Sequence, residues 1–230
     1  MVYFEKTDNE NAKKALKEAK IIGGECKSPE VLNALCEEFY NKCYLCEQKN
    51  PTSIHVEHFE AHNAKNNPKF YYSWKNLFWS CGHCNQAKDN IPILNCTNKK
   101  HDVSNWIKYK IDDSEKVILE SVYEGTSEKY KKFINNTIKL LLKIYNGVGY
   151  KEGTYLGPIE SENLRKKLIE EVDNFKTCLK KYEECLAEEK PQILKKIKRH
   201  LSKQSAFTAF KRWIILDNEY LKKEFEKYFD

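Results

Sequence analysis

Two pairs of cysteines with the same spacing are the first residues of this sequence that could do chemistry. Cys43-Tyr-Leu-Cys46 and Cys81-Gly-His-Cys84 are both C-x2-C motifs, and each can place two thiolates on one side of a tight turn. Two such motifs complete a tetrahedral site with four sulfur ligands, which structural zinc prefers. His83 lies inside the second motif and could replace a thiolate, but four cysteines already fill the shell. The sequence therefore predicts a structural Zn²⁺ held by Cys43, Cys46, Cys81 and Cys84.

The other cysteines lack this spacing, and we expect them to be small buried side chains: Cys26, Cys36, Cys96, Cys178 and Cys185. The N-terminus has no basic region followed by an apolar stretch, so we expect no secretion signal. In a reducing compartment, clustered cysteines are more often metal ligands than disulfides. No apolar run approaches the roughly 20 residues of a membrane span, so we expect a cytoplasmic protein without a membrane partner.

The segment between and after the cysteine motifs has a recognisable order of polar residues. It reads Ile54-His55-Val56-Glu57-His58-Phe59, then Trp74-Lys75-Asn76-Leu77, and the second motif continues as Asn85-Gln86-Ala87-Lys88. This order resembles the HNH, or ββα-metal, nuclease family. In that family an acidic residue and a histidine lie on the first strand, Asn-Leu lies on the second, and a histidine or asparagine opens the helix.

The resemblance implies a role for each of these polar residues. His58 would be the general base, for which an imidazole is suited near pH 7. Glu57 and Asn85 would hold one Mg²⁺ or Mn²⁺ through oxygen atoms and so relieve charge on the leaving group. Asn76 would orient the His58 imidazole or brace the loop between the strands, and Lys88 would contact a phosphate.

The neighbouring positions of Glu57 and His58 raise a geometric question. Successive residues of a regular strand face opposite sides, so both reach one metal site only if the strand bends or ends there. The polar loop that starts at Glu60 is consistent with such an end. His55 and His62 are nearby alternatives as base or ligand.

A narrower resemblance is to the HNH subunit of Septu-type anti-phage systems, which also occurs in some retron defence modules. It rests on Phe39-Tyr-Asn-Lys-Cys43-Tyr-Leu-Cys46-Glu47, on Glu57-His58-Phe59, and on the Asn136-Thr-Ile-Lys-Leu-Leu run. The nuclease core covers residues 39–90, and the subfamily likeness extends more weakly to 145. The chain departs from the pattern at Glu60-Ala61-His62, where a basic or proline-containing loop is expected.

This resemblance implies partners as well as chemistry. Nucleic acid is the expected substrate, with DNA ahead of RNA. In Septu-type systems the nuclease works with an ABC/SMC-like ATPase, and this chain has no G-x4-G-K-[ST] motif, so any ATP dependence must come from that partner. The C-terminal helices are the expected docking surface.

The elements that must position these residues are mainly helical. We expect an α+β, mainly α fold in which an N-terminal helical lead-in precedes the zinc-stabilised ββα-metal core (1–100) and a helical region with a short extended pair follows (101–230). The expected helices lie at 10–20, after the Ser28 cap, at 81–89, from Thr126 to Asn146-Gly147, through the seam described next, from Pro191, and at 206–216 and 220–229. The expected strands lie at 51–59, from Leu77, and at 106–111 and 116–122, and residues 60–75 and 147–157 are expected loops.

One expected helix carries a heptad-like apolar seam. Its members are Leu168, Val172, Phe175, Leu179, Tyr182 and Leu186. The seam indicates either an intramolecular helical hairpin or, as the alternative, a coiled coil with a partner.

The net charge of +6 over 230 residues conceals one basic stretch. Residues 190–216 contain no acid and eight cations, which are Lys190, Lys195, Lys196, Lys198, Arg199, Lys203, Lys211 and Arg212. Such a stretch attracts phosphate without sequence preference, and all of these except Lys190 are our candidates for nucleic-acid contact. The alternative is a solvated helix face paired with acids such as Glu188 and Glu189.

Three functions remain open at this point. The first is a metal-dependent HNH endonuclease that acts in phage defence under the control of an ATPase. The second is a stand-alone restriction-type HNH endonuclease. The third is a zinc-stabilised nucleic-acid-binding protein without catalysis.

Overall fold

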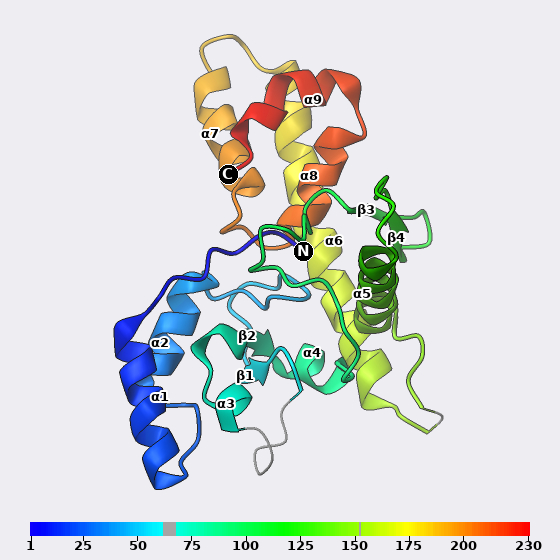
Figure 1. Cartoon of the computed structure of the whole chain (residues 1–230). Helices are drawn as coiled ribbons and strands as arrows, with labels where there is room; N and C mark the ends of the chain where they lie inside the picture. The colour runs from blue at the N-terminus through cyan, green and yellow to red at the C-terminus, as the bar shows by residue number, and fades with distance from the viewer. Residues whose placement is uncertain (62–67, 152) are drawn as a thin grey trace.

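The computed structural model describes residues 1–61, 68–151 and 153–230 (Figure 1). The chain is mainly helical with two antiparallel hairpins, as predicted. The helices are α1 (Glu10–Ile22), α2 (Pro29–Glu38), α3 (Pro68–Tyr71), α4 (Gly82–Ala87), α5 (Glu128–Asn146), α6 (Leu156–Glu184), α7 (Lys190–Leu201), α8 (Thr208–Leu216) and α9 (Glu219–Phe225), with 3-10 turns η1 (Trp74–Asn76) and η2 (Glu226–Tyr228). The strands are β1 (Ile54–His58), β2 (Leu77–Cys81), β3 (Ile107–Ile111) and β4 (Val117–Ser121).

The first two helices begin at side-chain caps. The Asn9 side chain accepts a hydrogen bond from the Ala12 N–H, and the Ser28 hydroxyl accepts one from the Val31 N–H. These bonds satisfy backbone donors that a helix leaves unpaired in its first turn. The predicted helix over 10–20 and the predicted cap at Ser28 are both confirmed.

The β1–β2 hairpin and α4 form the predicted strand, loop, strand and helix. Ile54 pairs with Cys81 and His58 pairs with Leu77 at the two ends of the ladder. The prediction of a plain loop over 60–75 is wrong in the described part, because α3 and η1 lie within it. Elements of one turn are too short to show an apolar period in the sequence. Residues 62–67, which include His62, lie outside the described residues.

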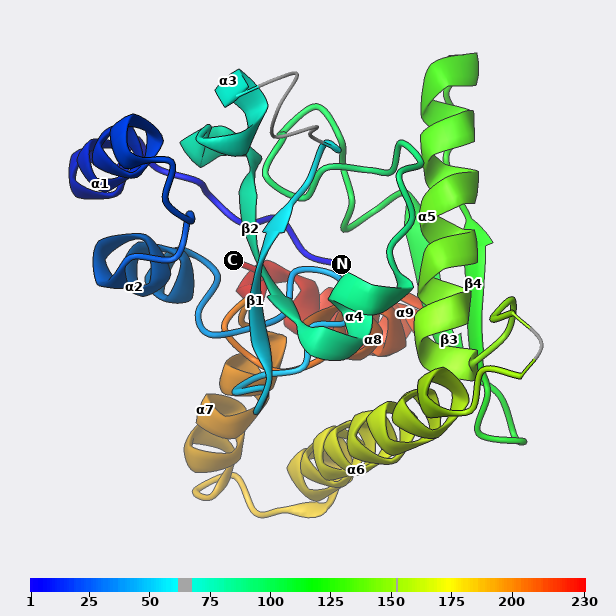
Figure 2. The ribbon, with the colours of Figure 1, turned by 90° about the horizontal axis from the view of Figure 1, so that it is seen from below.

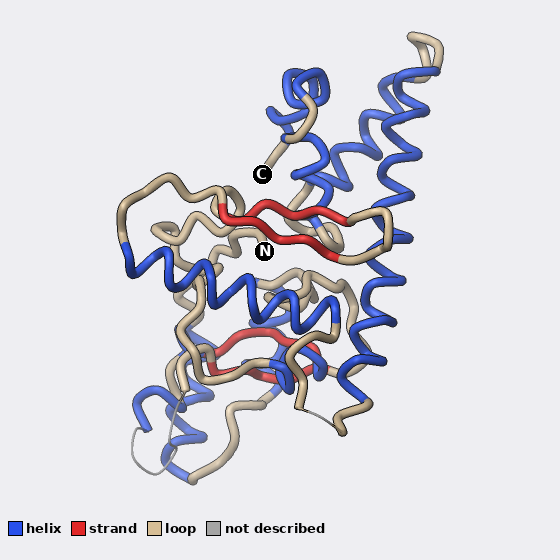
Figure 3. Tube along the Cα trace, turned by 90° about the vertical axis from the view of Figure 1, so that its right-hand side faces the viewer, coloured by secondary structure: helices blue, strands red, loops and turns tan. Residues whose placement is uncertain are grey.

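The second hairpin, β3–β4, packs along α5 (Figure 3). The Asn146 side chain joins them, since its Oδ1 accepts from the Val117 N–H at 3.0 Å and its Nδ2 donates to the Val117 carbonyl at 2.8 Å. The helix then ends at Gly147, whose φ of 70° is the left-handed conformation that glycine adopts at low cost. Both extended segments and the Asn146-Gly147 stop are confirmed.

The β1–β2 hairpin and α4 together are called the ββα unit below. The 29-residue helix α6 passes from this unit to the C-terminal helices (Figures 1 and 2). Along one face it buries Leu164, Leu168, Val172, Phe175 and Leu179. The last two of these pack with Ile197, Leu201, Ile215, Leu221 and Phe225 from α7, α8 and α9 in a small second core. The seam is therefore an intramolecular contact, and it ends before Leu186, which is 67% exposed.

A larger core unites the rest of the described chain. It contains side chains from the N-terminal segment, both hairpins, α5 and the beginning of α8. Residues from both sides of position 100 share it, so the division at that position stays a prediction. No helix in the described ranges is long and apolar enough to span a membrane.

Candidate metal centre and catalytic hairpin

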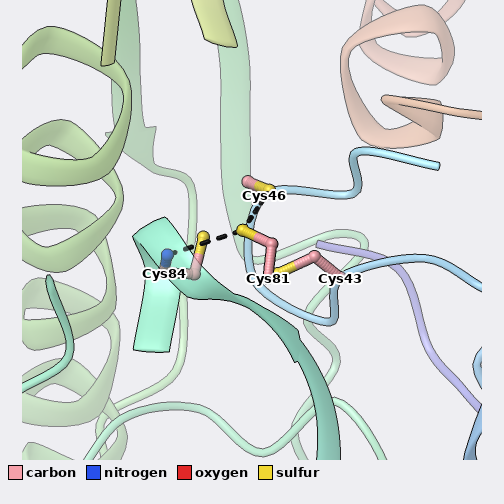
Figure 4. Close-up of side chains that lie close together, drawn as sticks. All are labelled: Cys43, Cys46, Cys81 and Cys84. Carbon is pink, nitrogen blue, oxygen red and sulfur yellow. Dashed lines mark hydrogen bonds between the residues drawn. The ribbon is translucent and has the colours of Figure 1, made fainter. Parts of the chain in front are cut away.

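The four predicted cysteines converge in the interior of the ββα unit (Figure 4). Their sulfur atoms all lie within 4.8 Å of one another, and the Cys46 and Cys81 sulfurs are 3.8 Å apart. Zinc–sulfur bonds of about 2.3 Å in a tetrahedron place sulfurs about 3.8 Å apart. Cys43, Cys46, Cys81 and Cys84 therefore form a group, here called the cysteine cluster, whose spacing fits structural zinc.

Local backbone geometry creates the first half of the cysteine cluster. After α2 the chain turns sharply, with positive φ angles at Tyr40, Asn41 and Glu47. The Glu47 N–H donates to the Cys43 carbonyl at 2.9 Å, and this bond closes the tight turn over residues 43–47, which we call the cysteine knuckle. The Tyr44 N–H donates to the Trp79 carbonyl at 3.0 Å, and this bond fastens the knuckle to β2.

The second half of the cysteine cluster lies where β2 becomes α4. Cys81 is the N-cap of α4, and its sulfur accepts the Cys84 N–H at 3.5 Å. Burial raises the pKa of the Cys46 and Cys84 thiols well above the ordinary cysteine value. Four thiolates in a buried environment require a cation that compensates their charge. A bound Zn²⁺ would supply that charge.

His83, the alternative ligand in the second motif, faces away from the sulfurs. Its Nδ1 is 3.1 Å from Glu160 Oε2, and its Nε2 is 2.8 Å from the Ile144 carbonyl oxygen. The ring thus joins α4 to α5 and α6. The alternative of His83 as a zinc ligand is wrong in this structure.

His58 is the last residue of β1, so the strand ends where the sequence required it to bend or end. Its Nε2 lies 2.9 Å from the Tyr71 carbonyl oxygen, and its ring stacks on the Tyr71 ring at 4.8 Å. Because a carbonyl only accepts hydrogen bonds, Nε2 carries a proton in this contact. Tyr71 is a partner that the sequence did not indicate.

Asn76 braces the loop between the strands. Its Nδ2 donates to the carbonyls of Glu60 at 3.0 Å and Phe70 at 3.1 Å, and its Oδ1 accepts the Glu60 N–H at 2.7 Å. Only 6% of the residue is exposed. Since Phe70 precedes Tyr71, this brace also fixes the carbonyl that holds His58. Of the two roles expected for Asn76, these contacts favour the brace.

Glu57 is held by Lys88 rather than by the other predicted metal ligand. Glu57 Oε1 is 2.8 Å from Lys88 Nζ, and the side chains are 13% and 4% exposed. Lys88 Nζ also donates to the His58 carbonyl at 3.4 Å. In this structure Lys88, next after α4, supplies the counter-charge that the half-buried carboxylate requires, and its contact with a phosphate stays a prediction.

Asn85 lies against His55 on the face of β1 that also carries Glu57. Asn85 Nδ2 is 3.5 Å from His55 Nδ1, and Ser53 Oγ is 3.4 Å from His55 Nε2. Residues two apart in a strand share a face, so His55 and Glu57 both point toward α4. Glu57 on β1 and Asn85 on α4 are therefore side chains with oxygen atoms on two elements that face each other. The positive charge next to the Glu57 carboxylate is the ammonium of Lys88. Carboxylate and amide oxygens are the ligand type that Mg²⁺ prefers, together with water and substrate phosphates.

The predicted basic stretch divides into two groups. Lys195, Lys196, Lys198 and Arg199 are exposed on α7, and Lys203 is half-buried. Lys211 and Arg212 are buried, with Lys211 Nζ at 2.8 Å from Glu171 Oε2 and Arg212 paired with Asp230. These two are wrong as nucleic-acid contacts, because acids distant in sequence neutralise them inside the fold.

A buried ion cluster next to the cysteine knuckle was not predicted. Glu47 is 2% exposed and lies 3.1 Å from the Met1 ammonium and 3.3 Å from Lys42 Nζ. Lys42 Nζ also donates to the Lys203 carbonyl at 2.7 Å and to the Thr208 hydroxyl at 3.2 Å. These bonds attach the knuckle to the turn between α7 and α8. In the sequence, the one indication of this ion cluster is that Lys42 and Glu47 directly flank the first C-x2-C motif.

Comparisons with known proteins do not assign the chain to a family. No model of a known protein family matches it, and no curated protein matches it significantly. The residues of the site therefore carry the functional argument.

Proposed function

We propose that the chain is a metal-dependent endonuclease of the HNH type that hydrolyses phosphodiester bonds in nucleic acid. The observation that carries the proposal is His58, placed at the end of β1 with its Nε2 fixed by the Tyr71 carbonyl at 2.9 Å. The sequence resemblance implies a ββα unit with two features. The cysteine cluster lies where β2 meets α4, here called the base, and an oriented imidazole lies at the opposite end of β1, here called the rim.

His58 supplies the base in this proposal. In this role the imidazole takes the proton of an attacking water. The brace by Asn76 and the stacking on Tyr71 keep the imidazole in one orientation, which makes both of them positioning residues. The reaction does not use the 2′-hydroxyl of RNA, so DNA and RNA are both within its chemistry.

Glu57 and Asn85 would hold one Mg²⁺ or Mn²⁺, which when bound neutralises charge that develops on the phosphate and the leaving oxygen. Lys88 must then leave the Glu57 carboxylate, because its ammonium is 2.8 Å from Oε1. Once released, Lys88 retains a positive charge beside the site.

Control by a partner completes the proposal. The chain lacks a phosphate-binding G-x4-G-K-[ST] loop, so an ABC/SMC-like ATPase would supply any dependence on ATP. We place the activity in anti-phage defence in the cytoplasm, and we place the ATPase on the C-terminal helices.

His58→Ala tests the proposal, with His55→Ala as the matched control on the same strand. Plasmid DNA, single-stranded DNA and RNA are incubated with Mg²⁺, with and without the partner ATPase and ATP. Loss of the base should lower the cleavage rate by about a hundredfold or more while the zinc content is unchanged, and His55→Ala should cut within a few-fold of wild type. If His58→Ala cuts like wild type and His55→Ala does not, the assignment of the base is wrong. Full activity of the chain alone would favour a restriction-type enzyme.

The Glu57–Lys88 ion pair favours one alternative. It neutralises the carboxylate that the metal would use, as expected of a zinc-stabilised nucleic-acid-binding protein without catalysis. Binding of nucleic acid without cleavage under every condition above would select that function.

A further inference from the structure

A groove of about 800 Å³ lies between the cysteine knuckle, α6 and the turn from α7 to α8. Four cations line it, and they come from three separate parts of the chain: Lys49, Lys167, Lys196 and Arg199. We call it the basic groove. Only two of these cations belong to the basic stretch of the sequence, so the fold has assembled a surface that the sequence alone does not show.

The cations of the basic groove are available to a ligand. All four are exposed and none of them has an ion pair within the described ranges of the chain, while Lys49 Nζ donates one hydrogen bond to the Gln204 carbonyl at 2.8 Å. Two acids also line the groove, but Glu171 is already neutralised by Lys211 at 2.8 Å, which leaves Glu170 against four positive charges. Such a surface attracts a polyanion.

The basic groove continues toward the candidate catalytic hairpin. A second hollow of about 220 Å³ shares Gln48 and Lys167 with it and is also lined by Ser53 and Gly82. Ser53 precedes β1 and contacts His55, which in turn contacts Asn85. The start of β1 lies on the same side of the molecule as α6 and α7 (Figure 2). The two hollows therefore form one path from α7 to the base of the ββα unit.

The lining of the basic groove distinguishes nucleic acid from a protein partner. Protein interfaces have an apolar, often aromatic centre. Among the described residues that line the groove, Phe207 is the one phenylalanine, tyrosine or tryptophan, and it is only 2% exposed. Nucleic-acid sites instead present lysine and arginine to a row of phosphates.

We infer that the basic groove binds the sugar-phosphate backbone of the nucleic-acid substrate and leads it to the hairpin. This inference rests on the proposed function for the identity of the ligand. It assigns substrate contact to Lys49 and Lys167, outside the basic stretch, and within α7 to Lys196 and Arg199 alone. Lys195 and Lys198 do not line the groove, and Lys198 lies over the Tyr228 ring at 4.2 Å.

Two matched pairs of variants test the inference in the full chain. Lys196→Glu/Arg199→Glu is compared with Lys195→Glu/Lys198→Glu, which changes the same charge on the same helix. Lys167→Glu is compared with Lys166→Glu, whose lysine is outside the groove and paired with Glu162. Binding of labelled 20-mers of duplex DNA, single-stranded DNA and RNA is measured by fluorescence anisotropy without added divalent ion, between 50 and 200 mM NaCl.

The groove variants should weaken binding of at least one 20-mer by about tenfold or more, and the controls by less than about threefold. The slope of log affinity against log salt should fall by about 0.7–0.9 for each cation removed from the groove. Equal weakening by groove and control variants would overturn the inference, as would a wild-type chain that binds none of the probes. Unchanged oligonucleotide binding with lost ATPase binding would also overturn it and make the groove a protein-docking surface. Because binding is measured without cleavage, a chain that binds but never cuts refutes the proposed nuclease and leaves the groove intact.

Discussion

The interior and the rim of the ββα unit use polar side chains in opposite ways. In the interior the cysteine cluster and the Lys42–Glu47 pair are almost completely buried. At the rim, Glu57, His58 and Asn85 are only partly buried, and the Lys88 side chain that pairs with Glu57 is 4% exposed. Interior groups cannot exchange their partners for water without a large cost, whereas rim groups can exchange theirs for substrate or a cation. The interior therefore determines the fold, and the rim holds the groups to which we assign the proposed chemistry.

The largest expected effect comes from the cysteine cluster. In Cys84→Ser a ligand of the cluster is lost, and zinc binding contributes folding free energy on the order of 10 kcal/mol to small metal-stabilised units. We expect the variant to lose its zinc, by metal analysis, and to lose several kcal/mol of stability by denaturant unfolding. Cys185→Ser is the control, since Cys185 is half-buried, lies outside the cysteine cluster, and donates its thiol hydrogen to the Tyr182 carbonyl at 3.5 Å. A Cys84→Ser chain with full zinc content and wild-type stability would contradict the contrast between interior and rim.

The next effect concerns the buried Glu47. Burial opposes its ionisation, but the Met1 ammonium and Lys42 lower its pKa from 4.5 to about 2. A carboxylate with a lowered folded-state pKa stabilises the protein above pH 4.5, and this contribution is lost as the pH falls toward 2. Glu47→Gln leaves Lys42 buried without its counter-charge and should cost about 3–5 kcal/mol at pH 7.

Unfolding of Glu47→Gln and wild type at pH 7 and at pH 3 measures this effect. The difference in stability between the two proteins should shrink at the lower pH, where the wild-type advantage is smaller. The exposed Glu115→Gln serves as the control and should change stability little at either pH. A stability difference that is the same at both pH values would mean that Glu47 stabilises the fold through packing and not through its charge.

The sequence predicted the interior better than the rim, and the reason is the range of the interactions. C-x2-C spacing and the Ser28 cap are local patterns, so they were found. The burial of Lys211 depends on Glu171, 40 residues earlier, and no local pattern shows such a pairing. The same applies to Lys88, which is 31 residues from Glu57, and to the Tyr71 carbonyl that holds His58. Residue types identified the candidate site, but only the fold shows the partners.

The smallest effect tests whether the rim exchanges its partners. Lys88→Met keeps the length of the side chain and removes the ammonium from Glu57, so a cation then meets a carboxylate without a competitor. An ion pair worth about 1 kcal/mol corresponds to about a fivefold change in affinity. We therefore expect the Mn²⁺ concentration for half-saturation, measured by calorimetry on the zinc-loaded chain, to fall about fivefold. Lys75→Met, at an exposed position near the same loop, should leave it unchanged. If Lys88→Met instead leaves Mn²⁺ affinity unchanged and lowers stability by several kcal/mol, the Glu57–Lys88 pair belongs with the interior groups, and the rim has no place for a catalytic cation.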